Sequence, residues 1–330
     1  RYRILVCVTI LQALMNPIAS LVLIRMNGGT AMMRILGIVG VQVCICVPII
    51  VFQFCKGKEF FSKEYWGYAL RIGIPIVPHY LSGIILNQGD RIMIDKMVGK
   101  TEVALYGLAY SIGMLVQLFI SGMNSALTPW MYSKIKKGDI RSMRKVLQLL
   151  SIVVVGIAVA LMLISPELVL IFGSPKYREA VYVIPPVAAS VFFIFIYNIL
   201  SMPQFYYEKT QFLMAASMAA AGANVVLNFI FIRLFGYIAA GYTTLACYML
   251  YSVGHYIVSK RILVNEGIQE NLMNPGFLLA CSVFLIGASI ICNLIFPYRI
   301  LRYAILLASA GLVFWKKELL LKTMADIRKK

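Results

Sequence analysis

The sequence predicts an all-α integral membrane protein with about ten transmembrane helices, and three observations support this fold class. First, 61% of the 330 residues are hydrophobic and only 13% are charged, whereas soluble domains have about 45–50% apolar and about 25% charged residues. Second, the sequence contains ten hydrophobic runs of roughly the 20 residues that a membrane-spanning helix needs. Third, basic residues are distributed unevenly between the predicted loops. The runs are 4–24, 35–55, 67–98, 104–130, 147–172, 181–202, 211–233, 237–259, 276–296 and 299–315.

Local features support these runs in chain order. The first two are joined by a turn that contains Gly28. The third contains Pro75 and Pro78, each of which removes a backbone donor and favours a kink. The fifth is apolar on every side over 152–160, and the last is short and contains Arg302. Several boundaries carry the aromatic residues typical of a membrane interface, namely Tyr65, Trp66, Trp130, Tyr132, Tyr206, Tyr207 and Trp315.

The basic residues predict the orientation of the chain. When alternate loops are assigned to alternate sides of the membrane, 21 of the 31 Lys and Arg residues fall on one side. Such an excess is typical of the cytoplasmic side, so both ends of this chain are expected in the cytoplasm. Residues 316–330 are expected to lie on the inner leaflet as a basic amphipathic segment. The excess of Lys and Arg on the cytoplasmic side thus accounts for much of the net charge of +18. We therefore expect no nucleic acid partner.

Two segments, 16–31 and 224–239, share Asn, Ile, Arg, Gly and Ala at matching positions. Because six predicted spans separate the copies, both have the same orientation, as in transporters with two parallel six-helix lobes. A complete protein of this kind would have fourteen helices, with four preceding this chain. The predicted parts are the last two helices of an N-terminal lobe (1–56), a cytoplasmic linker (57–66), a C-terminal six-helix lobe (67–260), a terminal helix pair (261–315) and a cytoplasmic tail (316–330).

The end of the 67–98 run carries the main candidate site residues. Asn87, Arg91 and Asp95 are spaced four residues apart and are predicted to share a helix face, with Arg91 and Asp95 able to pair. Asp90 adds a second carboxylate. Charged residues at membrane depth usually mark a functional cavity, here one for an anionic or sugar substrate or a coupling cation. The alternative is a solvated end of a helix that has already left the hydrocarbon.

Other polar residues lie within the predicted spans. Gln117 and Asn124 share one helix face, and Asn224 and Asn228 share another. Such amides either line a substrate path or join neighbouring helices.

The remaining candidates indicate neither a metal site nor catalysis. His79 and His255 are interpreted as packed or cavity-facing side chains rather than metal ligands. Glu167, next to a loop, is expected to be solvated. The seven Cys residues lack metal-ligand spacing. The sequence contains no P-loop, dinucleotide-binding glycine pattern or hydrolase motif, so we predict no enzyme activity and no bound cofactor.

Three segments resemble one family. Residues 75–113 have a proline-bearing helix, Asp90-Arg91, a short Gly-containing turn and a Tyr-Gly-x-Ala helix start; residues 167–190 have Phe-Gly followed by Tyr-x-x-Ala. Residues 223–248 have two Asn positions, a Gly, then Ala-Ala-Gly and a Thr. In this order they are similar to the C-terminal half of the polysaccharide (O-antigen or exopolysaccharide) flippases of the multidrug/oligosaccharidyl-lipid/polysaccharide exporter superfamily.

The resemblance implies a two-lobe transporter of the bacterial inner membrane. It would move undecaprenyl-diphosphate-linked oligosaccharide between leaflets by alternating access, as an antiporter coupled to Na⁺ or H⁺. The implied partners are this lipid-linked substrate, membrane lipids, and glycan polymerase or other assembly proteins. The substrate-binding residues would be Arg91, Asn87, Gln117, Asn124, Asn224 and Asn228, and the ion-coupling residues Asp90 and Asp95.

Four other functions stay open. A cation-coupled multidrug exporter of the same superfamily would favour an acidic cavity, whereas Arg91 accompanies the two carboxylates here. A peptidoglycan-precursor flippase has a closely similar task. A membrane glycosyltransferase or glycan polymerase is expected to have a large outer loop, and the sequence has none. A purely structural membrane protein would not require the repeat or the ionisable residues inside the spans.

Overall fold

The computed structural model describes residues 2–26, 31–58 and 61–315, and every regular element in these residues is helical, as predicted. The chain divides into two compact units, one ending at Leu70 and the other beginning at Arg71. The predicted tail, 316–330, lies outside the described residues.

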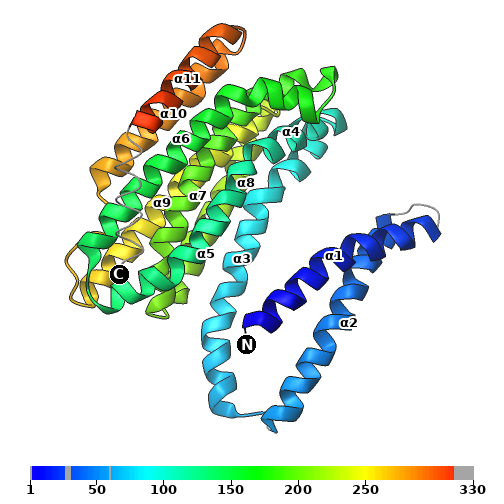
Figure 1. Ribbon diagram of the computed structural model, residues 1–330, viewed down its shortest axis with the longest axis vertical. Coiled ribbons are helices and arrows are strands. Elements are labelled where there is room, and N and C mark those ends of the chain that lie inside the picture. Colours follow the sequence, from blue (N-terminus) through cyan, green and yellow to red (C-terminus); the bar gives the residue numbers. More distant parts are fainter. Residues whose placement is uncertain (1, 27–30, 59–60, 316–330) are drawn as a thin grey trace. The chain divides into compact units, whose positions relative to one another are not determined.

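The first unit is a helical hairpin of α1 (Tyr2–Met26) and α2 (Ala31–Gly57) (Figure 1). The helices approach closely at Gly37, where a Cβ atom would lie 2.6 Å from the Ser20 Cα atom. Small residues permit this close packing of helix backbones in membranes. Arg25 lies in the last turn of α1, as the repeat predicts, whereas Gly28 falls outside the described residues.

The boundary between the units falls within α3 (Lys63–Met97). The second unit contains α3 from Arg71 onward, eight further α-helices and a short 3-10 helix. Their bounds are α3 Lys63–Met97, α4 Lys100–Gly113, α5 Leu115–Lys136, α6 Ile140–Phe172, η1 Pro175–Val183, α7 Ile184–Tyr206, α8 Thr210–Phe235, α9 Ala239–Asn265, α10 Pro275–Ile295 and α11 Arg299–Trp315.

Helices α7 and α9 form the interior of the second unit. α7 is buried around most of its circumference, with Phe192 and Phe195 fully buried, and it packs against α5, α6, α9 and α10. α9 packs against α7 and α8 (Figure 1). Its buried residues include Thr244, Ser252 and His255, so one face of α9 brings polar groups into an otherwise apolar bundle.

Helices occupy all ten predicted runs, and eight segments of the described chain are long and apolar enough to cross a membrane. α9 is not among these eight because its polar residues lower its hydrophobicity, and α11 has only 17 residues. The 104–130 run bends at Met114, between α4 and α5. Gly113 packs there against α7, where a Cβ atom would lie 2.7 Å from the Val187 Cγ1 atom.

Hairpin α8–α9 turns through Gly236, whose φ of 74° lies in the left-handed region that favours glycine. Arg233 occupies the last turn of α8, as Arg25 does in α1. Its guanidinium lies 4.0 Å from the centroid of the Phe229 ring, an arrangement that stabilises an arginine at the end of a helix.

A proline opens α6 near its end. Pro166 has no N–H for the Met162 carbonyl oxygen four residues earlier. The Ser165 hydroxyl donates to this oxygen instead, at 2.8 Å. The Leu163 carbonyl oxygen, on the next residue, accepts from Arg302 Nη1 of α11 at 2.6 Å.

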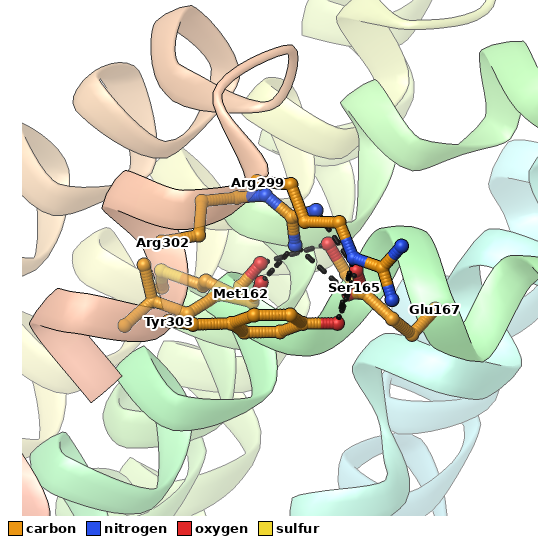
Figure 2. A network of polar contacts seen from close by, with 7 residues as sticks. Met162, Ser165, Glu167, Arg299, Arg302 and Tyr303 are labelled. Atoms are coloured by element: carbon orange, nitrogen blue, oxygen red, sulfur yellow. Dashed lines mark hydrogen bonds and ion pairs between the residues drawn. The ribbon is translucent and has the colours of Figure 1, made fainter. Parts of the chain in front are cut away.

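The same arginine forms an ion pair. Arg302 Nη1 and Nη2 each lie 2.8 Å from a carboxylate oxygen of Glu167, and the Tyr303 hydroxyl donates to Glu167 at 3.0 Å (Figure 2). Glu167, which was expected to be solvated, is partly exposed but is held by a partner that lies 135 residues further along the chain. The bidentate pair connects α11 to α6, and it allows an arginine within the last predicted run.

Candidate functional site

Four helices bring polar side chains together around Asp90, which is fully buried. Tyr106 of α4 donates to Asp90 Oδ2 at 2.5 Å, and Thr244 of α9 donates to the same oxygen at 2.6 Å. Asn228 Nδ2 of α8 donates to Asp90 Oδ1 at 2.5 Å. Both oxygens of this carboxyl group are thus held by side chains that are 16 to 154 residues away in the sequence.

Asn228 extends the network along α8 and into α9. Its Nδ2 atom also donates to Asn224 Oδ1 at 3.2 Å, and its Oδ1 atom accepts from the Thr243 hydroxyl. Both asparagines are fully buried, and Asn224 Nδ2 has no hydrogen-bond partner among the described residues. We call the whole set, Asp90, Tyr106, Asn224, Asn228, Thr243 and Thr244, the Asp90 cluster.

The donors to Asp90 are neutral. A buried carboxylate is strongly disfavoured unless a positive charge compensates it or a proton neutralises it. The cluster offers carboxyl, amide, hydroxyl and phenol oxygens, the ligands that a hard cation such as Na⁺ prefers. Within the described residues no group of three His, Cys, Asp or Glu side chains could hold a metal ion. The chemistry of the cluster therefore fits a proton or an alkali cation better than a transition metal.

A second polar contact lies one turn earlier on α3. Asn87 Oδ1 accepts from the Tyr110 hydroxyl at 2.7 Å and from the Tyr248 hydroxyl at 3.4 Å. The ring of Tyr110 lies 5.4 Å from the Arg91 guanidinium. Tyr110 thus contacts both Asn87 and Arg91, which connects the half-buried arginine to the buried polar interior.

Arg91 does not form the predicted pair with Asp95. Its Nη1 atom donates to Gln88 Oε1 at 3.2 Å, and Asp95 is exposed. Asn87 and Arg91 do share the side of α3 that meets Tyr110, as their spacing predicts. In the next turn of α3, Ile94 is buried and Asp95 is exposed. Asp95 therefore points away from the Asp90 cluster.

The structure also separates the α5 candidates from the cluster. Gln117 and Asn124 are half-buried, and in the described residues neither hydrogen bonds to a member of the Asp90 cluster. The Asn124 carbonyl oxygen accepts from the Thr128 hydroxyl at 2.7 Å, while Gln117 Oε1 is buried without a hydrogen-bond partner. Of the predicted site residues, the structure therefore joins Asp90, Asn224 and Asn228 directly.

Three members of the cluster were missed by sequence reasoning. Tyr106 begins the Tyr-Gly-x-Ala segment, and Thr243 and Thr244 are a polar pair within a hydrophobic run. Such a pair on one helix is a usable signal, because Thr side chains inside membrane helices often hydrogen bond across helices. The sequence alone does not reveal which carboxylate they face.

Comparisons with known proteins agree with the earlier resemblance. A family model described as "Polysaccharide biosynthesis protein" matches residues 1–136, and the MatE family model matches residues 75–230. A protein of the Lsg locus of Haemophilus influenzae is 28% identical over 172 residues, which are 49% of this chain and 41% of that protein. An uncharacterized membrane protein of the same organism is 29% identical over 191 residues, 54% of this chain and 46% of its own length.

The matched regions have defined limits. They cover less than half of each of these two relatives, and no solved structure matches the chain. The MatE match includes Asp90, Asn224 and Asn228 but ends before Thr243 and Thr244.

Proposed function

We propose that this chain is part of a polysaccharide flippase, because the models of two families in the multidrug/oligosaccharidyl-lipid/polysaccharide exporter superfamily match residues 1–136 and 75–230. The complete protein would carry undecaprenyl-diphosphate-linked oligosaccharide across the bacterial inner membrane by alternating access. Both ends of this chain would be cytoplasmic, and glycan polymerase or other assembly proteins would use the product. The observation that carries this proposal is the contrast between two adjacent residues of α3, a fully buried Asp90 and a half-buried Arg91.

Asp90 is proposed to couple transport to an ion gradient. Its carboxyl group has three neutral donors, and a bound H⁺ or Na⁺ would neutralise it in the membrane interior. Tyr106, Asn228 and Thr244 would hold the carboxyl group in place. We assign this role to Asp90 rather than to Asp95, because Asp95 is exposed and outside the cluster.

Arg91 is proposed to bind the diphosphate of the lipid-linked substrate. A guanidinium offers paired donors that match phosphate oxygens, and among the described residues Arg91 makes one hydrogen bond, to exposed Gln88 at 3.2 Å. Tyr110, beneath the guanidinium, connects it through Asn87 to the interior. Asn87, Gln117 and Asn124 are proposed to contact the glycan, whereas Asn224 and Asn228 would act through the buried cluster.

The test uses the complete gene in a bacterial host that lacks its own polysaccharide flippase and makes the matching glycan. Wild type, Arg91→Ala, Asp90→Asn and the control Gln88→Ala would be compared for surface glycan at equal membrane expression. We expect wild type and Gln88→Ala to restore surface glycan. Arg91→Ala and Asp90→Asn should each lower it at least tenfold. Full activity of both variants would remove Asp90 and Arg91 from the transport path.

A cation-coupled multidrug exporter is the second candidate, because a buried carboxylate would serve either transporter. Failure of wild type to restore surface glycan, together with ethidium efflux that Asp90→Asn abolishes, would favour it over the flippase.

A further inference from the structure

The two histidines of the 330-residue chain lie side by side. His79 is on α3 and His255 is on α9, and their ring centroids are 6.4 Å apart. The fold thus brings together two residues that are 176 positions apart in the sequence (255 minus 79), and we call the pair the histidine layer. Along α3 this layer lies 11 residues before Asp90, about 16 Å of helix, so it is distinct from the Asp90 cluster.

The hydrogen bonds of His255 show where its proton lies. Gln204 Nε2 is 2.8 Å from His255 Nδ1, and it also donates to the Leu200 carbonyl oxygen at 3.2 Å. Because an amide nitrogen is only a donor, His255 Nδ1 accepts and the ring proton is on Nε2. His255 is therefore a neutral imidazole in this arrangement. His255 Nε2 and Gln204 Oε1 are both buried without a partner among the described residues.

His79 is the more accessible member of the pair. It is half-buried, whereas His255 is fully buried. Its Nδ1 atom lies 3.0 Å from the Tyr251 hydroxyl of α9. This contact and the ring packing against His255 connect the early part of α3 to α9. Pro78 directly precedes His79 and Pro75 lies four residues before it, and helices bend most easily where prolines remove backbone hydrogen bonds.

The groups packed on the two rings are uncharged at neutral pH. Tyr80 of α3, Phe205 of α7 and Tyr251 of α9 contact the His79 ring, and Tyr197 of α7 stacks on His255 with centroids 5.8 Å apart. No carboxylate is among these partners. An imidazolium would therefore be poorly accommodated while α3 stays against α9, since a buried charge requires a partner or water.

We propose that His79 and His255 form a second proton-binding site, distinct from the Asp90 cluster. This histidine site takes up one proton, on His79, when α3 separates from α9. The proton comes from water. It adds to a ring nitrogen of His79, and no other bond forms or breaks. Because the neutral pair fits the closed contact and the cation does not, the contact is stable above the ordinary pKa of histidine, about 6.5. It weakens as the pH falls below that value.

The site is tested by nuclear magnetic resonance of the complete protein in lipid bilayers, with histidine labelled by ¹³C and ¹⁵N. His79→Gln and His255→Gln assign the two ring signals. At pH 8 we expect two neutral rings, with the His255 proton on Nε2. Between pH 8 and pH 5, His79 should become an imidazolium while His255 stays neutral. Two rings that both stay neutral to pH 5 would overturn the proposal, as would protonation of His255 before His79.

Tyr251→Phe tests whether the contact with Tyr251 favours the neutral form of His79. The substitution removes a hydrogen bond of the closed contact, so the midpoint of the His79 titration should rise by about one pH unit. A midpoint that stays fixed or falls would contradict the proposal, because Tyr251 would then not favour the neutral form that holds α3 against α9. Tyr80→Phe keeps an aromatic ring beside His79 and should leave the midpoint unchanged. The titration needs no transported substrate, so its outcome and that of the surface-glycan assay are independent.

Discussion

At the scale of single residues, Asn228 holds several groups of the Asp90 cluster at once. Its amide donates to Asp90 and Asn224 and accepts from Thr243. In the membrane interior water does not readily replace such bonds, so removing one side chain leaves several polar groups unsatisfied. The structural role of Asn228 can therefore be measured apart from any role in transport.

We expect Asn228→Ala to lower the free energy of unfolding by about 1–3 kcal/mol, because Asp90 and Thr243 each lose a buried partner. Thermal unfolding of the purified protein in detergent would measure this as a lower Tm. Gln88→Ala, at an exposed position on α3, should leave the Tm within error of wild type. An equal Tm for both variants would show that the cluster contributes little to stability.

Part of this site could be predicted from the sequence. The four-residue spacing of Asn224 and Asn228 places both on one face of α8, and Asp90 stood out as a charge within a hydrophobic run. The same spacing rule wrongly paired Arg91 with Asp95. Helical periodicity shows which residues share a face, but not which face meets the neighbouring helices. Thr244 lies 154 residues from Asp90, and one sequence contains no information on that distance.

At the scale of helices, the ion pair between α6 and α11 determines how the last described helix is attached. Arg302 is 3% exposed and Glu167 is the more accessible partner. The hydrophobic run predicted α11 correctly, but its arginine looked unfavourable until the partner was known. Hydrophobic runs predict where helices lie in the sequence, but they do not predict which distant helices form ion pairs.

Arg302→Leu should destabilise the protein by about 2 kcal/mol, a reduced value for a pair with one partly exposed partner. Adding Glu167→Leu should recover part of this loss, because the uncompensated carboxylate is then gone as well. Arg299→Ala, which changes a solvent-exposed residue, should leave the Tm unchanged. Additive effects of the two leucine substitutions, measured by thermal unfolding, would exclude an energetic coupling between Arg302 and Glu167.

At the scale of the whole molecule, the number of spans fixes which loops share a side of the membrane. The described helices occupy all ten predicted runs. If each run crosses once, the turns after α5 and α7 lie on one side, and the turns after α6 and α8 lie on the other. Because basic residues are usually in excess on the cytoplasmic side, we propose that the first side faces the cytoplasm.

Alkaline phosphatase fusions test this orientation, because that reporter is active only outside the cytoplasm. Fusions after Gly173 or Gly236 should be active, and fusions after Lys137 or Glu208 should be inactive. Green fluorescent protein, which fluoresces when it folds in the cytoplasm, should give the opposite pattern at the same positions. Phosphatase activity at Lys137 together with inactivity at Gly173 would invert the proposed orientation.

The opened turn of α6 also has a consequence for biosynthesis. The Leu163 carbonyl oxygen accepts from an arginine that the ribosome adds 139 residues later. At about 5–20 residues per second this interval is roughly 7–28 s. During that time α6 has already been made, while its polar turn lacks the arginine that later binds it. The contact between α6 and α11 is therefore expected to form late in synthesis, and a ribosome stalled before Arg302 should hold a nascent chain that is sensitive to quality-control proteases.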